Sequence, residues 1–355
     1  MSDRLTYVIC CTEGQGPGIH ACHYDEESGN LSITSAVEEG VANPFYGVID
    51  PTGRCLYVVD HCKQCGGVDG GAVSAYRIHG PDGDLSLINT QPVGGECPCY
   101  IAMSNNGRFV LTACYVSGSV TCLPVKEDGS LGAAEGVVHD VPAGREAAHA
   151  HSIILSPDNR FALAADLGID RVLTYQFDSE GNGLAREDLG HVQAAEGSGP
   201  RHVVFHPNGR RVYCQTEYDN TMIAFDYDAA SGSLQVIGAW PTLPEDFSDV
   251  SYGSDVHIHP NGRFVYGSNR GHDSIALFEI DEASGRLDSR GQTLTGGKFP
   301  RGFAIDPAGR HLLVANQNSD EIVVFAIDAA SGALTRTADV ANIHKPCCFV
   351  FAPSL

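Results

Sequence analysis

Positive charge is scarce in this sequence. Its 355 residues include 22 lysines and arginines against 44 aspartates and glutamates, so the formal net charge is −22. Nucleic acids and acidic membrane surfaces should repel such a chain, and neither is an expected partner. Only four of the cations are lysines. Arginine, which binds carboxylates and phosphates through two parallel hydrogen bonds, therefore carries most of the positive charge.

Long apolar runs are also absent. No stretch could span a bilayer, and the start, Met-Ser-Asp-Arg-Leu-Thr, lacks the basic and apolar regions of a signal peptide. The cysteines number thirteen, which is odd. Without a secretion signal they indicate free thiols in a reducing compartment rather than a disulfide framework. We therefore expect a cytoplasmic protein.

Several catalytic and metal-binding motifs are missing or incomplete. No Gly-x-Ser-x-Gly segment is present, which argues against a serine hydrolase. Cys62-Lys-Gln-Cys65 has the spacing of zinc ligands, but no second pair follows and the segment lies in an irregular glycine-rich loop. His257-Ile-His259 puts two imidazoles on one strand face, but His259 directly precedes an A–B turn, far from the expected functional rim. We expect no metal and no other cofactor.

The sequence does contain a repeat of about fifty residues. A short turn that ends in leucine recurs seven times, and each leucine follows a glycine by one or two residues. The leucines are Leu31, Leu85, Leu131, Leu184, Leu234, Leu287 and Leu334. A turn of the type Asp-Pro-x-Gly-Arg runs in step with it, and its arginine falls at positions 54, 108, 160, 210, 263 and 310. This period, built from short β-rich runs, is typical of propeller blades.

Each repeat supplies four short strands, here named A to D from the central channel outward. The runs at 263–269 and 275–280, for example, are rich in β-branched and aromatic residues and are separated by a polar loop. The Asp-Pro-x-Gly-Arg turn joins A to B, the polar loop joins B to C, and the leucine turn joins C to D. The sequence therefore predicts an all-β fold of four-stranded antiparallel blades.

The two ends of the chain together complete one blade. Residues 346–353 match strand A of the sixth repeat, and residues 4–10 match a strand B. The last blade therefore takes its inner strand from the C-terminus and its other three strands from residues 4–40, which closes the ring without a free sheet edge. We predict a seven-bladed β-propeller that forms a single domain over residues 1–355 and is monomeric or weakly self-associating.

One rim of the channel gathers polar residues, because strand A starts where strand B ends. The predicted starts of strand A are Phe45, Cys99, His151, Arg201, Ser254, Arg301 and Cys347. The predicted ends of strand B are Cys10/Cys11, Asp60/His61, Cys114/Tyr115, Asp166/Leu167, Thr216/Glu217, Asn269/Arg270 and Asn316/Gln317. Arg201, Arg270 and Arg301 hold equivalent rim positions in an acidic protein, which favours an anion pocket over solvated arginines.

Two cysteine couples occupy matching rim positions. Cys10 with Cys347 in the seventh blade and Cys99 with Cys114 in the second should each lie close together, because strands A and B pair. Packing of small apolar residues is the favoured interpretation. A redox or metal role is the alternative.

Six segments resemble the seven-bladed propeller lactonase family, which includes propeller-type 6-phosphogluconolactonases and fungal 3-carboxy-cis,cis-muconate cyclases. They are the segments 149–158, 166–171, 199–202, 216–218, 268–274 and 315–318. The resemblance implies metal-free hydrolysis, or the reverse closure, of a lactone on a small anionic acid. It also implies a catalytic set made of His151, Arg201, Glu217 and Arg270. Further substrate-binding residues are predicted at Tyr115, Asp166, His202, Asn269, Arg301 and Gln317.

Lactone hydrolysis needs a polarised carbonyl, an activated water and a proton for the leaving hydroxyl. Arg201 and Arg270 are expected to hold the substrate anion or the oxyanion, and His151 has a pKa suited to proton transfer. Glu217 is expected to act with His151 as a proton-transfer pair, the alternative being that it only pairs with Arg201.

The leading hypothesis is a lactonase acting on a sugar-acid lactone, with 6-phosphogluconolactone as the default substrate. The alternatives are a cyclase that forms a lactone from an unsaturated dicarboxylic or tricarboxylic acid, and a non-catalytic propeller that binds a partner through its rim. The polar rim favours small-molecule chemistry, because protein-binding rims carry apolar and aromatic anchors.

Overall fold

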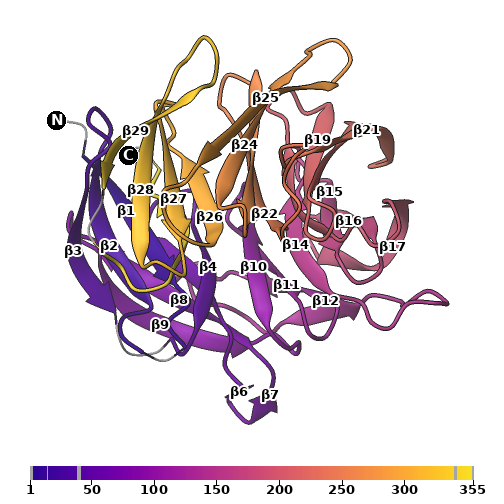
Figure 1. Ribbon diagram of the computed structural model, residues 1–355. Helices are drawn as coiled ribbons and strands as arrows, with labels where there is room; N and C mark the ends of the chain where they lie inside the picture. Colours follow the sequence, from indigo (N-terminus) through magenta and orange to yellow (C-terminus); the bar gives the residue numbers. More distant parts are fainter. Residues whose placement is uncertain (1–2, 14, 38–40, 340–341, 354–355) are drawn as a thin grey trace.

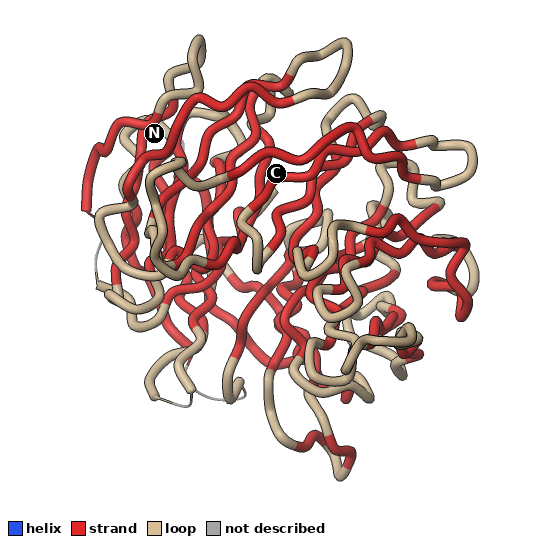
Figure 2. The backbone as a smooth tube through the Cα atoms, turned by 45° about the vertical axis from the view of Figure 1, so that its right-hand side comes forward, coloured by secondary structure: helices blue, strands red, loops and turns tan. Residues whose placement is uncertain are grey.

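The computed structural model shows a ring of seven antiparallel sheets (Figures 1 and 2). It describes residues 3–13, 15–37, 41–339 and 342–353, and within these ranges every regular element is a β-strand. The ends of the predicted domain and residues 14 and 38–40 of the predicted closing blade lie outside them. The fold is the seven-bladed propeller that the repeat predicts.

Each blade has four strands. From the innermost strand outward they are β4 (Pro44–Ile49), β5 (Cys55–Asp60), β8 (Ala72–His79) and β9 (Asp84–Pro92) in blade 1; β10 (Pro98–Met103), β11 (Phe109–Cys114), β12 (Ser119–Pro124) and β13 (Glu135–Val138) in blade 2; β14 (Ala150–Leu155), β15 (Phe161–Asp166), β16 (Arg171–Asp178) and β17 (Gly183–Gln193) in blade 3; β18 (Pro200–Phe205), β19 (Arg211–Thr216), β20 (Thr221–Tyr227) and β21 (Leu234–Pro241) in blade 4. They are β22 (Tyr252–Ile258), β23 (Phe264–Arg270), β24 (Ser274–Ile280) and β25 (Leu287–Leu294) in blade 5; β26 (Pro300–Ile305), β27 (His311–Asn316), β28 (Glu321–Ile327) and β29 (Leu334–Asp339) in blade 6; and β30 (Pro346–Phe351), β1 (Asp3–Cys10), β2 (Ile19–Asp25) and β3 (Leu31–Val37) in blade 7.

The turns between strands A and B need a left-handed backbone residue. Glycine supplies it with φ of 67–75° at positions 53, 107, 209, 262 and 309, and Asn159 takes its place in blade 3 with φ 57°. At Gly309 the His259 ring also lies so close that a Cβ would be 2.7 Å from its Nε2. That nitrogen is 2.7 Å from the Gly309 carbonyl oxygen. His259 therefore lies at the A–B turns, as predicted.

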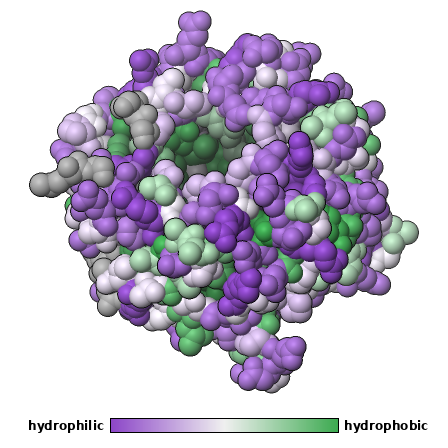
Figure 3. Space-filling model, turned by 90° about the horizontal axis from the view of Figure 1, so that it is seen from above, coloured by the Kyte–Doolittle hydropathy of each residue, from purple (hydrophilic) through white to green (hydrophobic). Residues whose placement is uncertain are grey.

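The apolar core lies between neighbouring blades. Leu111 of β11 and Ile153 of β14, for example, belong to one buried cluster. Middle strands such as β23 are buried along their whole length, whereas the outer strand β25 is largely exposed. Seen from above, the surface is mostly hydrophilic around a hollow with apolar residues in it (Figure 3). The described part of the chain contains no helix that could cross a membrane.

The two chain ends close the ring as predicted. The sheet of blade 7 has the order β3-β2-β1-β30, and Val8 of β1 lies opposite Phe349 of β30. Both side chains belong to a buried cluster that reaches across to Leu313 of blade 6. The innermost strand is therefore held by its own blade and by the blade that precedes it in the sequence.

Phe349→Ala should lower the free energy of unfolding by about 3–5 kcal/mol, because it removes a buried aromatic ring from the seam. Urea unfolding followed by tryptophan fluorescence would measure the loss. Leu294→Ala on the outer strand β25 is the matched control, since Leu294 is 65% exposed. Equal losses in the two variants would contradict a packed seam.

The B–C loop of blade 1 differs from the prediction. It contains a small hairpin, β6 (Gln64–Cys65) and β7 (Val68–Asp69), which projects at the bottom of Figure 1. The sequence predicted an irregular loop there. Gly66 and Gly67 both have positive φ, which is what a two-residue hairpin turn requires.

Candidate active site

A β-bulge near the start of every inner strand creates the rim of the channel. In blade 4, Pro200 pairs with Thr216 and His202 pairs with Gln215, so Arg201 has no partner in the ladder. The same interruption occurs in all seven blades. Bulges re-aim side chains and are frequent beside active sites. The bulged positions include all the predicted starts of strand A.

Bulge residues from five blades converge on one recess. Its lining consists of Phe45, Tyr46, Cys99, Arg201, His202, Arg301 and Cys347. The recess has room for about one water molecule. Five of the seven predicted starts of strand A therefore share one narrow recess, and His151 and Ser254 are not among its lining residues.

Glu217 lies between two of the predicted arginines. Its Oε2 atom is 2.8 Å from Arg201 Nε and 2.8 Å from Arg270 Nη2. Burial alone would raise the pKa of Glu217, but Arg270 and Arg201 outweigh burial and lower the pKa. Glu217 is therefore ionised at neutral pH and holds two nearly buried guanidiniums in place. The pairing with Arg201, given above as the alternative role of Glu217, is present.

Each of these guanidiniums keeps one terminal nitrogen for a ligand. Arg201 Nη1 donates to the Ser254 carbonyl oxygen at 2.9 Å, and Arg270 Nη2 donates to the Gly253 carbonyl oxygen at 2.8 Å. Within the described residues, Arg201 Nη2 and Arg270 Nη1 make no hydrogen bond. These nitrogens can donate to an anion without breaking the contacts that orient the side chains.

His151 is a buried, neutral imidazole. Its ring centroid lies 5.2 Å from that of His202 and 5.7 Å from that of Tyr115. Burial lowers the pKa of His151 well below 6.5, and Arg201 and other nearby cations lower it further. Its Nδ1 atom is enclosed and has no hydrogen-bond partner in the part of the chain that the structure describes. His151 is thus present as the free base at neutral pH.

Arg301 reaches the same recess from blade 6. Its guanidinium lies 4.8 Å from the centroid of the Phe45 ring, and its carbonyl oxygen accepts a hydrogen bond from Ser254 Oγ at 2.6 Å. The third predicted arginine therefore lies with Arg201, and both line the recess.

Two predicted substrate-binding residues are enclosed away from the recess. Asp166 is fully buried; Oδ1 accepts the His149 N–H at 2.7 Å, and Oδ2 is 2.6 Å from His139 Nδ1. Asn269 is also fully buried and exchanges hydrogen bonds with Thr242. Asp166 and Asn269 are each the first residue of the two that were predicted to end a strand B. Because side chains alternate along a strand, this first residue points away from the channel.

Two further predicted residues, Tyr115 and Gln317, have different surroundings. The Tyr115 ring stacks on His149 at 4.5 Å and meets His151 edge-on, so it lies beside the proposed base. Gln317 is buried, and no described residue hydrogen-bonds its Oε1 atom. No described contact connects Gln317 with the three arginines.

The bulges shift the register at the two cysteine couples, so that neither couple forms a pair in the ladder. Cys10 pairs with Pro346 rather than Cys347, and Cys114 pairs with Pro98 rather than Cys99. The Cys347 sulfur instead accepts the Cys11 N–H at 3.2 Å. All thirteen cysteines are free thiols. In the described part of the chain, no group of three or more histidine, cysteine, aspartate or glutamate side chains is arranged to hold a metal ion.

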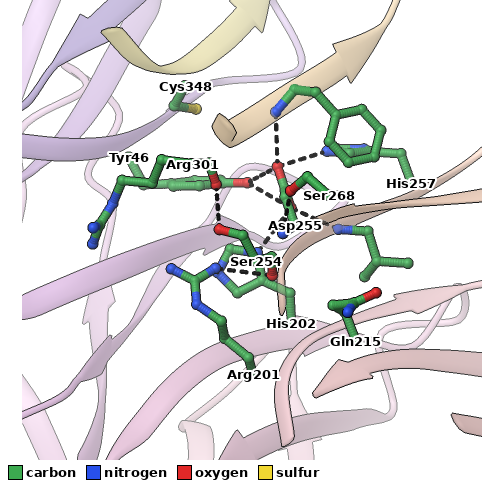
Figure 4. Close-up of polar contacts among 12 residues, drawn as sticks. Tyr46, Arg201, His202, Gln215, Ser254, Asp255, His257, Ser268, Arg301 and Cys348 are labelled. Carbon is green, nitrogen blue, oxygen red and sulfur yellow. Dashed lines mark hydrogen bonds and ion pairs between the residues drawn. The ribbon is translucent and has the colours of Figure 1, made fainter. Parts of the chain in front are cut away.

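Sequence reasoning missed a polar group beneath the arginines. His202, predicted to bind substrate, is 3% exposed, and its Nδ1 atom is 2.8 Å from Asp255 Oδ1 (Figure 4). Tyr46 and His257 also contact Asp255. One signal was available, because Asp255 directly follows the predicted start of a strand A at Ser254.

Comparison with known proteins shows which family the chain belongs to. A 6-phosphogluconolactonase of Bacillus subtilis (strain 168) is 36% identical over 310 residues, which cover 86% of each chain. A 6-phosphogluconolactonase of Formosa agariphila is 33% identical over 300 residues, covering 82% of this chain and 83% of that one. The structure of a periplasmic gluconolactonase from Pseudomonas aeruginosa superposes with a TM-score of 0.90 at 31% identity and covers 99% of both chains.

The family model of the seven-bladed β-propeller lactonases matches residues 6–351, which include every blade and all the rim residues described above. The chain belongs to the seven-bladed β-propeller lactonase family.

Proposed function

We propose that this protein hydrolyses the lactone of a sugar acid, with 6-phosphogluconolactone as the first substrate to test. The observation that carries the proposal is a buried His151 that packs against His202 and Tyr115 and whose pKa is lowered by burial and by the charges of Arg201, Arg301 and Arg270. This arrangement combines a free base with preorganised positive charge, and a lactone hydrolase needs both. The related lactonases support the same assignment.

The arginines are proposed to divide two tasks. Arg201 and Arg270, fixed by Glu217, stabilise the oxyanion that forms when the lactone carbonyl is attacked. Arg301, which lines the recess with Arg201, binds the phosphate or a hydroxyl-rich end of the substrate. A substrate anion is attracted by this local charge although the whole protein carries a net charge of −22.

His151 is proposed to move the proton. It takes a proton from a water molecule, whose oxygen forms a bond to the lactone carbonyl carbon. The resulting oxyanion re-forms the carbonyl and the ring C–O bond breaks. The imidazolium then gives its proton to the departing ring oxygen, and the product is the open-chain hydroxy acid.

The direct test measures hydrolysis of 6-phosphogluconolactone beside gluconolactone, which lacks the phosphate, with the spontaneous rate subtracted. We expect turnover of at least one of them, and a chelator should leave the rate unchanged because no step uses a metal. Failure on both substrates would contradict the proposed function. A rate that a chelator abolishes and a divalent cation restores would contradict the metal-free mechanism.

The pH dependence should reflect the lowered pKa of His151. The reaction needs the unprotonated imidazole, so activity is lost as the pH falls through that pKa, which lies well below 6.5. We expect kcat/KM for gluconolactone to stay level from about pH 8 down to about 6.5 and to fall only under more acidic conditions. The non-phosphorylated lactone is used because a phosphate itself titrates near about pH 6. An acid limb centred at 6.5 or above would contradict this role of His151.

The cytoplasm remains the proposed location, and the thirteen free thiols support it because thiols persist in reducing compartments. The recess and the pair of arginines held by Glu217 are built from residues of one chain. A monomer or a weak homo-oligomer therefore suffices for the proposed reaction.

A further inference from the structure

A buried carboxylate near Arg201 and Arg301 is contacted by residues of four blades (Figure 4). Asp255 of β22 is 2% exposed. The Tyr46 hydroxyl of β4 lies 3.4 Å from both of its oxygens, and His202 Nδ1 of β18 lies 2.8 Å from Oδ1. The Phe303 N–H of β26 donates to Oδ2 at 3.2 Å, and His257 Nε2 is also 3.2 Å from Oδ2. Asp255 is thus held from several sides of the channel.

The contacts of His202 determine which ring nitrogen carries its proton. Arg201 Nη1 lies 3.1 Å from His202 Nε2, and a guanidinium can only donate a hydrogen bond. Nε2 must therefore be the unprotonated acceptor. On the other side, the carboxylate of Asp255 can only accept, so Nδ1 must carry the hydrogen. Only the neutral Nδ1–H tautomer satisfies both neighbours.

Two tyrosines keep the His202 ring in the orientation that these hydrogen bonds need. Tyr46 and Tyr100 stack on each other with centroids 4.6 Å apart. Each meets the His202 ring edge-on, at 5.7 Å and 4.9 Å respectively. The ring is therefore packed between aromatic side chains of blades 1 and 2 and cannot turn without displacing them.

We propose that Asp255 and His202 are positioning residues, which hold the Arg201 guanidinium through the chain Asp255–His202–Arg201 so that its free Nη2 faces the reacting carbonyl. This inference rests on the proposed lactone hydrolysis. Asp255 fixes the tautomer of His202, the tautomer supplies an acceptor for Nη1, and Glu217 holds Nε from the other side. Neither Asp255 nor His202 needs to touch the substrate.

The electrostatics of the group agree with this role. Burial lowers the pKa of His202 to about 4, and Arg201 adds to that effect, so the ring stays neutral. Burial alone would raise the pKa of Asp255, but His257 and His202 outweigh it and lower the pKa. The carboxylate therefore remains ionised, as the hydrogen-bond chain requires.

The tautomer can be measured without any substrate. Histidine-labelled protein should give a long-range ¹H–¹⁵N spectrum in which His202 is protonated at Nδ1 and unprotonated at Nε2, the signal being assigned by its absence in His202→Gln. An Nε2–H tautomer in the wild type would overturn the proposal. Because this readout needs no catalysis, a protein inactive on lactones would refute the proposed function while leaving the hydrogen-bond chain to be judged separately.

Kinetics test whether the chain matters for the reaction. Asp255→Asn should lower kcat/KM by about 10–100-fold, the usual effect of losing a partner that orients an active-site group. Asp306→Asn is the matched control, because Asp306 is also fully buried and contacts His311 and Tyr24, but at the far end of blade 6. Its variant should lose stability and keep kcat and KM. Equal kinetic effects in the two variants would overturn the positioning role.

A second pair of variants keeps the test decisive if Asp255→Asn does not fold. His202→Gln retains a carbonyl oxygen that can accept from Arg201, whereas His202→Phe fills the same space with no acceptor. We expect the phenylalanine variant to lose about 10–100-fold in kcat and the glutamine variant to stay within about 10-fold of the wild type. Identical rates in the two folded variants would overturn the proposal. If His202 only filled space, it would not matter whether the side chain at this position can accept a hydrogen bond from Arg201.

Discussion

Replacing Arg201 or Arg270 with alanine should lower kcat/KM for a lactone by at least about 100-fold. Each guanidinium is oriented by Glu217 and a backbone carbonyl, and each keeps a terminal nitrogen for the substrate. Both guanidiniums are nearly buried, so their charge acts in a low-dielectric environment. Initial rates on phosphorylated and non-phosphorylated lactones would measure the effect, with thermal unfolding as the check on folding.

Arg186→Ala is the matched control for the arginine variants. The Arg186 side chain is 81% exposed and pairs with Glu135 on the outer surface. Its loss should leave both kcat/KM and stability close to wild type, because exposed ion pairs contribute little. Near-wild-type turnover in both Arg201→Ala and Arg270→Ala would remove these residues from the reaction.

His151→Ala should lower kcat by about 10²–10⁴-fold while the protein still folds, because it removes the only base proposed for the attacking water. The acid limb of the pH profile should disappear with it. His79→Ala, which alters an exposed histidine on the outer part of blade 1, is the control and should keep full activity. A wild-type rate in His151→Ala would exclude the proposed base.

Glu217→Gln combined with His151→Ala tests whether the two residues act as one unit. Arg201 forms an ion pair with Glu217 and also depresses the pKa of His151, so both residues act on one charged environment. We expect the double variant to lose much less than the product of the two single losses. Fully multiplicative losses would assign Glu217 and His151 to separate steps.

The fold could be predicted because its determinants are local. Each A–B turn requires a left-handed residue next to its anchor arginine, and glycine or asparagine appears there in every copy. The match of residues 346–353 to an inner strand then fixed the closure of the ring. The hairpin at Gly66 and Gly67 was missed because a strand of two residues leaves no periodic pattern.

The site could be predicted only in part. Counting along the strands located His151, Arg201 and Arg301, because their distance from the anchor turns is constant. The bulges shift the ladder by one residue, which a count of alternating positions does not reveal, so the count could not predict that Cys10 lies opposite Pro346. Asp255 was overlooked because its partners come from blades 1, 4 and 6, and this proximity exists only in the closed ring.

The seven bulges have a consequence for how the specificity of this protein can diverge. A bulged residue takes no part in the ladder, so exchanging its side chain leaves the strand pairing undisturbed. Phe45, Cys99 and Cys347 occupy such positions and line the recess without supplying charge. Mutation at these three places can reshape the entrance for a different lactone while Arg201 and His151 keep their task. Evolution can thus alter substrate choice here without altering how the strands pair.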